Sequence, residues 1–156
     1  MKILFVCTAN VCRSPLAEVI LKKKLQDRNY TGIEVMSAGV RNYNLPRDEN
    51  MSAIARKAGY EMGGVAQYAS QEVLESADLI ICMENHHVVE IQKRLPYMLW
   101  ERLYRFNVIC FGEKTDLADP SGNTDYIYQY SFDTIEAGCE ILAQRLAGPI
   151  NKGKIQ

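Results

Sequence analysis

The sequence predicts an α/β fold, in which a doubly wound sheet of four parallel strands carries helices on both faces. Three observations lead to this prediction. Short, nearly continuous apolar runs are typical of strands buried on both faces of a parallel sheet. Longer segments between them repeat their apolar residues at helical spacing. The 156 residues suit a single domain, which we expect to span 1–156 with its core at about 2–147.

The four strands are expected at the apolar runs, in chain order. These runs are KILFVC, IEVMSA, DLIICM and NVICF, at residues 2–7, 33–38, 78–83 and 107–111. Strands that alternate with helices are joined by right-handed crossovers, and ligands bind at their carboxyl ends. The residues that follow the first strand are therefore the first place to look for a functional site.

Helices are expected between and after these strands. Apolar residues recur at helical spacing behind the first strand and near the end of the chain: Ala17, Ile20, Leu21 and Leu25, then Ile135, Cys139, Leu142 and Leu146. Ser14 and Pro15 suit the N-cap and the first position of the first helix. Residues 41–50 and 112–126 are expected to form long surface loops.

Charge and composition narrow the class of protein. Eighteen Lys and Arg face nineteen Asp and Glu, so no net field attracts nucleic acid or an anionic membrane. The apolar runs are too short to cross a bilayer, and no signal-peptide core follows Met1 and Lys2. The five cysteines are odd in number and scattered, which is typical of reduced thiols. We therefore expect a cytoplasmic protein with no nucleic-acid or membrane partner, and we expect a monomer.

The stretch VCTANVCRSP, at residues 6–15, concentrates reactive side chains directly after the first strand. Its backbone N–H groups and the positive end of the following helix predict an anion cradle of the kind that binds phosphate. Arg13 adds a planar guanidinium that matches two phosphate oxygens. In this field the thiolate of Cys7 is favoured over the thiol. A thiolate that faces a bound phosphoryl group is a nucleophile in place.

Four motifs, taken in order, give the chain a family resemblance. A cysteine, five residues, then arginine and serine is the pattern of cysteine-dependent phosphatases. With CTANVCRSP, SAGV, SADLIICM and DLADPSG in succession, the sequence resembles the low-molecular-weight protein tyrosine phosphatase family over about residues 2–147. The resemblance implies hydrolysis of phosphotyrosine on a protein substrate through a phosphocysteine intermediate. It implies no cofactor and no metal.

The resemblance also assigns roles to single residues. Cys7 is the nucleophile, Arg13 binds the phosphoryl oxygens, and Asp119 is the general acid. Ser14 hydrogen-bonds the thiolate, and Asn10 holds the shape of the loop. The phosphate-binding set is Thr8, Ala9, Asn10, Val11, Cys12, Arg13 and Ser14. Cys12 resembles a second loop cysteine that forms a protective disulfide with Cys7 under oxidation.

Some positions depart from the commonest pattern of the family. Ala9 stands where glycine is usual, and it fits only if its φ angle is not positive. Aromatic residues usually follow the Asp-Pro pair, but Ser121 and Gly122 do so here. Other residues are therefore expected to wall the substrate slot, and the candidates are Arg41, Tyr43 and Tyr126.

Three alternatives to a tyrosine phosphatase remain open. A bacterial branch of the family includes protein arginine phosphatases, with a threonine where this chain has Val11. Valine cannot orient a water or a guanidinium, which favours phosphotyrosine. An arsenate reductase needs a relay of thiols, but Val89 stands where a third cysteine would follow Cys82. A cysteine phosphocarrier or a binding module would not need both Arg13 and Asp119.

Several residues that could carry chemistry are interpreted as structural. Cys7 and Cys12 lack a second pair at zinc-ligand spacing. The adjacent His86 and His87 are expected to face solvent or to cap the segment after the third strand. Asp116 lies three residues before Asp119 and is not followed by proline, so we expect Asp119 to be the acid.

Overall fold

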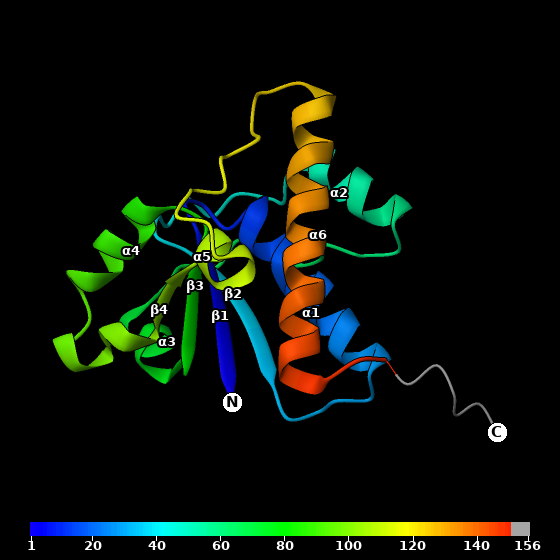
Figure 1. The fold of residues 1–156 in the computed structure, drawn as a ribbon. Helices are drawn as coiled ribbons and strands as arrows, with labels where there is room; N and C mark the ends of the chain where they lie inside the picture. Colours follow the sequence, from blue (N-terminus) through cyan, green and yellow to red (C-terminus); the bar gives the residue numbers. More distant parts are fainter. Residues whose placement is uncertain (151–156) are drawn as a thin grey trace.

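The computed structural model, shown in Figure 1, describes residues 1–150 and has the predicted α/β architecture. Its strands are β1 (Lys2–Cys7), β2 (Glu34–Gly39), β3 (Leu79–Cys82) and β4 (Leu103–Arg105). Its helices are α1 (Arg13–Asp27), α2 (Glu49–Lys57), α3 (Gln71–Ser76), α4 (Asn85–Gln92), the 3-10 turn η1 (Tyr97–Arg102), α5 (Phe106–Phe111) and α6 (Asp125–Ala147). The strands pair in parallel in the order β2-β1-β3-β4, which confirms the predicted four-stranded parallel sheet.

Helices cover both faces of this sheet, as the continuous apolar strands predict. Ile3 and Phe5 of β1 point into a cluster with α1, α2, α5 and α6. Leu4 and Val6 point to the opposite face, where a second cluster contains residues of α3 and α4. Figure 1 shows α1 and α6 on one side of the strands and α3 and α4 on the other. Two buried faces explain why no polar residue interrupts β1 between Ile3 and Cys7.

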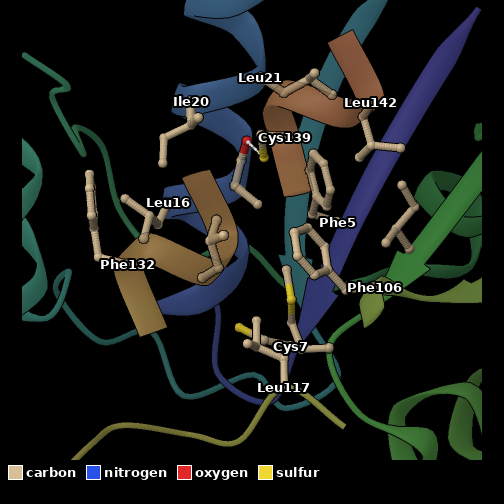
Figure 2. Packing of buried hydrophobic residues seen from close by; sticks show 14 of the residues in the cluster. Phe5, Cys7, Leu16, Ile20, Leu21, Phe106, Leu117, Phe132, Cys139 and Leu142 are labelled. Carbon is tan, nitrogen blue, oxygen red and sulfur yellow. Dashed lines mark hydrogen bonds between the residues drawn. The ribbon is translucent and has the colours of Figure 1, made fainter. Parts of the chain in front are cut away.

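The larger of the two clusters extends to the functional end of the sheet. Figure 2 shows Phe5, Phe106 and Cys139 in its middle, with Cys7 and Leu117 at one end. The thiol of Cys7 is therefore anchored in the core while the chain beyond it turns toward the surface.

The prediction of the fourth strand is wrong. Residues 107–111 belong to helix α5, and the strand that pairs with β3 is the preceding segment Leu103–Arg105. The buried residues Phe106, Asn107 and Cys110 have helical spacing, and Gly112 ends the helix with a left-handed φ of 70°. A short apolar run fits either a buried strand or a buried helix, whereas an edge strand that is half exposed gives little apolar signal.

The predicted start of the first helix is also wrong, by two residues. Helix α1 begins at Arg13, with Cys12 at the N-cap and no side-chain capping bond. Ser14 and Pro15 lie inside the first turn, where N–H groups still lack helical partners, so proline is tolerated there. The Ser14 hydroxyl is consequently available for another contact.

The other expected elements occur within one or two residues of their predicted bounds. The apolar faces predicted for the first and last helices lie on α1 and α6, which pack against each other. The two long loops run through residues 41–48 and 112–124. Among the described residues, no helix combines the length and the apolar character that a bilayer crossing needs.

Candidate active site

Cys7 ends β1 and begins the loop that leads into α1. Its buried Sγ lies 2.9 Å from the Oγ of Ser14. Asn10 Nδ2 donates to the same Ser14 oxygen at 2.9 Å. Because this oxygen accepts from Asn10, its one proton can be donated to a Cys7 thiolate or to the carbonyl oxygen of Ala38, which lies 3.4 Å away. The contact that the resemblance implies for Ser14 is therefore present in the geometry.

Asn10 turns the loop between Cys7 and α1. Its φ of 57° lies in the left-handed region, which asparagine adopts more readily than most residues. Its Nδ2 also donates to Ser37 Oγ at 2.9 Å, and its Oδ1 accepts from Gln67 N–H at 2.8 Å. The Ser37 hydroxyl donates in turn to Glu18 at 2.5 Å. The asparagine side chain thereby ties the loop to β2 and α1.

Ala9 meets the condition that its place in the loop imposes. Among the described residues, the non-glycine positions with positive φ are Asn10, Asn29 and Asn44, so Ala9 does not need a glycine conformation. Gly39, at the end of β2, is where the loop needs a glycine. A Cβ on Gly39 would lie 2.7 Å from Thr8 O and 2.9 Å from Asn10 N.

We expect Gly39→Ala to destabilise the protein by about 1–3 kcal/mol, because backbone atoms of the loop would have to move away from the new methyl group. The displaced cradle should also bind inorganic phosphate more weakly. Denaturant unfolding and phosphate inhibition measure the two effects. Gly63→Ala is a control for stability, because its Cβ meets nothing within 4 Å. Unchanged stability and phosphate inhibition in Gly39→Ala would contradict this account of the loop.

Arg13 lies buried beneath the loop and is held by the segments that follow β3 and α5. Its Nη1 donates to Glu84 Oε2 at 2.9 Å and to the carbonyl oxygen of Leu117 at 2.6 Å. The ion pair with Glu84 fixes the plane of the guanidinium at the carboxyl end of the sheet. Glu84 is a site residue that no motif predicted, and its one signal in the sequence is its place directly behind the third predicted strand.

Asp119 and Asp116 occupy different environments on the same loop. Asp119 is about half exposed, with its Oδ2 3.9 Å from Arg13 Nη2 and its Oδ1 accepting from Ser121 N–H at 3.0 Å. Asp116 Oδ1 instead accepts from Asn85 N–H at 2.8 Å and from Arg105 at 3.3 Å. Asp116 therefore fastens the loop to α4 and β4, and Asp119 is the carboxyl group that faces the phosphate loop.

His87 supports the loop from α4. Its Nδ1 accepts from the backbone N–H of Glu84 at 3.1 Å, so the ring proton is on Nε2, which lies 2.9 Å from Thr8 Oγ1. Burial, together with His86 and Arg13, lowers the pKa of His87 to about 4. A neutral His87 therefore donates to Thr8 near neutral pH. Of the two predicted alternatives, His87 caps the segment after β3, while His86 is exposed to solvent.

A cavity of about 220 Å³ opens over the loop, and most of the predicted site residues line it. Its lining consists of Cys7, Thr8, Ala9, Val11, Cys12, Arg13, Tyr43, Leu45, Asp119 and Ser121. Of the predicted wall residues, Tyr43 lines this cavity and the other two do not. Arg41 forms a two-fold ion pair with Glu90, with both contacts at 2.7 Å. Tyr126 projects into solvent from the start of α6. Leu45, which no motif predicted, forms part of the cavity wall instead.

The five cysteines are buried and free of disulfides. Burial raises the pKa of Cys12, and the nearby Asp48 and Cys7 raise it further. Cys82 is wholly buried, which raises its pKa, and it lies in the cluster on the opposite face of the sheet from Cys7. The sheet therefore separates Cys82 from the loop, so Cys82 is a core residue, as predicted.

The described residues contain one group of side chains with the donor types of a metal site, Glu84, His86 and His87. The hydrogen bonds of the group oppose such a role. Both ring nitrogens of His87 are engaged by Glu84 N–H and Thr8, and the Glu84 carboxylate is paired with Arg13. This cluster is accordingly part of the support of the loop.

The fold and the loop together define an α/β phosphatase with a cysteine and an arginine at the carboxyl end of its first strand. The comparison with protein families agrees. The model of the low molecular weight phosphotyrosine protein phosphatases matches residues 2–151, and the chain belongs to this family. It is thereby a phosphatase, a hydrolase of phosphoric esters.

Relatives of known function are similar over almost the whole chain. The low molecular weight protein-tyrosine-phosphatase Etp of Escherichia coli is 29% identical over 150 residues, 93% of this chain and 94% of the relative. The protein-arginine-phosphatase of Bacillus subtilis is 31% identical over 150 residues, 94% and 97% of the two chains.

Solved structures give the same picture of the fold. A YwlE arginine phosphatase with a phosphorylated active-site serine has a TM-score of 0.87 and 27% identity, over 94% of this chain and 95% of its own. A protein tyrosine phosphatase from Entamoeba histolytica has a TM-score of 0.86 and 28% identity, over 94% and 96%.

Proposed function

We propose that this phosphatase hydrolyses phosphotyrosine on proteins through a phosphocysteine intermediate on Cys7. One observation carries the proposal: Cys7, Arg13 and Asp119 line a single cavity of about 220 Å³. A nucleophile, a cation for the phosphoryl oxygens and an acid for the leaving group are the three functions that the reaction needs.

In the first step, the Cys7 sulfur attacks phosphorus. The S–P bond forms as the P–O bond to the tyrosine breaks, and Asp119 transfers its proton to the departing oxygen. Arg13 and the backbone N–H groups of the loop bind the equatorial oxygens, on which negative charge develops. The hydroxyl of Ser14 stabilises the thiolate before attack and as the leaving group of the second step.

In the second step, water attacks the phosphocysteine. The ionised Asp119 accepts a proton from the water, a new P–O bond forms, and the S–P bond breaks to restore the Cys7 thiolate. No residue in this scheme needs a metal, because Arg13 and the loop amides supply the positive field.

A protein arginine phosphatase is the second candidate function, and it is favoured by the likeness to the protein-arginine-phosphatase of Bacillus subtilis and to the YwlE arginine phosphatase. Val11 opposes it. This residue lines the cavity, and a valine offers no hydroxyl to orient a guanidinium leaving group or the attacking water. Tyr43 and Leu45 line the same cavity and suit an aromatic ring.

Rates on matched phosphotyrosine and phosphoarginine peptides, without added metal, distinguish these functions. We expect kcat/KM to be roughly tenfold or more higher for phosphotyrosine, a difference of about 1.4 kcal/mol in transition-state binding. Val11→Thr should raise the relative rate on phosphoarginine, while Val11→Ile, which adds no hydroxyl, should not. A higher rate on phosphoarginine in the unaltered protein would replace the first function by the second.

The same cavity supports a role for Cys12 in protecting Cys7. Peroxide would oxidise the Cys7 thiolate to a sulfenic acid, and Cys12 would then displace water from it to form a disulfide. Both cysteines line the same cavity, which supports this pairing. We further propose that this enzyme is a monomer of one domain. We also propose that it works in the cytoplasm, where reduced cysteines persist.

A further inference from the structure

Arg47 reaches the phosphate loop from the long segment between β2 and α2. Its Nη1 donates to both oxygens of Asn10, the backbone carbonyl and Oδ1, the latter at 2.9 Å. Its Nε donates to Gly63 O at 3.1 Å. One guanidinium thus joins three segments that are distant in the sequence. Arg47 lies outside the four motifs that carry the family resemblance.

The backbone that carries Arg47 is itself anchored to the same loop. The next residue, Asp48, donates its N–H to Val11 O at 2.8 Å and caps α2 by accepting from Met51 N–H at 2.8 Å. Tyr128 of α6 donates to the second oxygen of Asp48 at 2.9 Å. The base of the Arg47 side chain is therefore held in place, and its guanidinium approaches Asn10 from a fixed direction.

The contact with Oδ1 has a consequence for Cys7. A guanidinium can only donate, so Arg47 and the N–H of Gln67 together require that the oxygen of the Asn10 amide face them. The Nδ2 group must then face Ser14, whose Oγ lies 2.9 Å from Cys7 Sγ. A chain of three hydrogen bonds thereby connects Arg47 to the nucleophile.

The contact with the backbone carbonyl supports the unusual conformation of Asn10. A left-handed residue other than glycine costs of order 1 kcal/mol, which neighbouring contacts have to offset. Arg47 does so from the side of a separate cavity of about 470 Å³, whose lining includes Glu18, Ser37 and Gly63. It is not among the residues that line the substrate cavity, so it acts on the reaction through Asn10.

The Arg47 guanidinium also places a positive charge beside the phosphate loop. Partial burial lowers the pKa of Arg47, while Glu18 and Cys7 raise it. The guanidinium remains positively charged there, because arginine is not deprotonated in proteins. Lys22 forms an ion pair with Glu18 at 2.7 Å, so part of the negative charge near Arg47 is already balanced.

We propose that Arg47 is a positioning residue, which holds Asn10 in its left-handed turn so that the loop and Ser14 are aligned for phosphate and for Cys7. This proposal rests on the proposed function for its catalytic consequence. The shape of the phosphate cradle, however, can be measured without turnover.

The test compares Arg47→Ala and Arg47→Lys with Arg56→Ala, an exposed arginine of α2 that pairs with Glu61. We expect Arg47→Ala to lower kcat on an aryl phosphate by roughly 10–100-fold, the order of loss for a slightly misplaced reacting group. Arg47→Lys should keep part of the rate because one donor and the charge remain. Arg56→Ala should stay within about twofold of the unaltered protein, as expected for an exposed site.

Two further measurements separate positioning from simple destabilisation. In a Cys7→Ser background, calorimetric titration with inorganic phosphate should show about tenfold weaker binding after Arg47→Ala, a loss that corresponds to about 1.4 kcal/mol. In an Asn10→Gly background, where the turn adopts a positive φ without cost and the Oδ1 contact is absent, Arg47→Ala should have little additional effect on kcat, because residues that act through one another are not additive.

Unchanged kcat and phosphate affinity in a folded Arg47→Ala protein would overturn the proposal, even if its melting temperature fell. Additive effects of Arg47→Ala and Asn10→Gly would overturn it as well. Failure of the proposed function would give a different experimental result from failure of this proposal. In that case Cys7→Ser keeps turnover, while the phosphate titration still reports whether Arg47 shapes the cradle.

Discussion

Replacement of Cys7 by serine is expected to abolish turnover of an aryl phosphate, with a loss of more than about 10⁴-fold, while the protein still folds and binds phosphate. A serine hydroxyl is not ionised at neutral pH and cannot replace the thiolate as nucleophile and leaving group. The cradle should persist, because its backbone amides and Arg13 do not depend on the sulfur. Steady-state rates and a calorimetric phosphate titration measure the two properties.

Cys110→Ala is the matched control for this experiment. Cys110 is as buried as Cys7, but it lies on α5 and is not among the residues that line the substrate cavity. Its replacement should lower stability and leave kcat almost unchanged. Retained turnover in Cys7→Ser would remove Cys7 from the role of nucleophile.

Replacement of Asp119 by alanine is expected to have an effect that depends on the leaving group. The proton that Asp119 supplies matters most for a poor leaving group such as the tyrosyl oxygen, for which the rate should fall roughly 10²- to 10⁴-fold. For a nitrophenolate, which leaves readily without a proton, the loss should be much smaller. The alkaline limb of the pH profile, which reports the protonated carboxyl group, should disappear in the variant.

Asp116→Ala provides the comparison on the same loop. Because Asp116 is bound to Asn85 N–H and to Arg105, its loss should loosen the loop and lower both rates by the same modest factor. Equal losses for good and poor leaving groups in Asp119→Ala, or a larger loss at Asp116, would show that the acid is a different residue.

Glu84 illustrates how the position of the Arg13 guanidinium depends on the fold. The arginine and its acidic partner are 71 residues apart, and they meet because β1 and β3 are neighbours in the sheet. The same neighbourhood brings His87 to Thr8, across 79 residues. The pairing of the strands, rather than any local motif, therefore builds the support beneath the phosphate loop.

The sequence alone was enough to predict the α/β class, three of the four strands, and the loop with Cys7 and Arg13. These features are local. Buried strands and amphipathic helices carry their own periodicities, and a loop of seven consecutive residues keeps its nucleophile and its arginine together in any fold that contains it. The predicted strand at 107–111, which is part of helix α5 in the structure, shows the limit, because five mostly apolar residues do not distinguish a buried strand from a buried helix.

The tertiary structure alone decided which distant side chains complete the site. Arg47 is 37 residues from Asn10, and its position before Asp48 gave no signal of their contact. Tyr43 lines the cavity and Arg41 does not, although both belong to one loop, because Arg41 is held outward by Glu90. Spacing along a chain describes neighbours within an element, whereas contacts between elements follow from strand order and packing, which no short segment encodes.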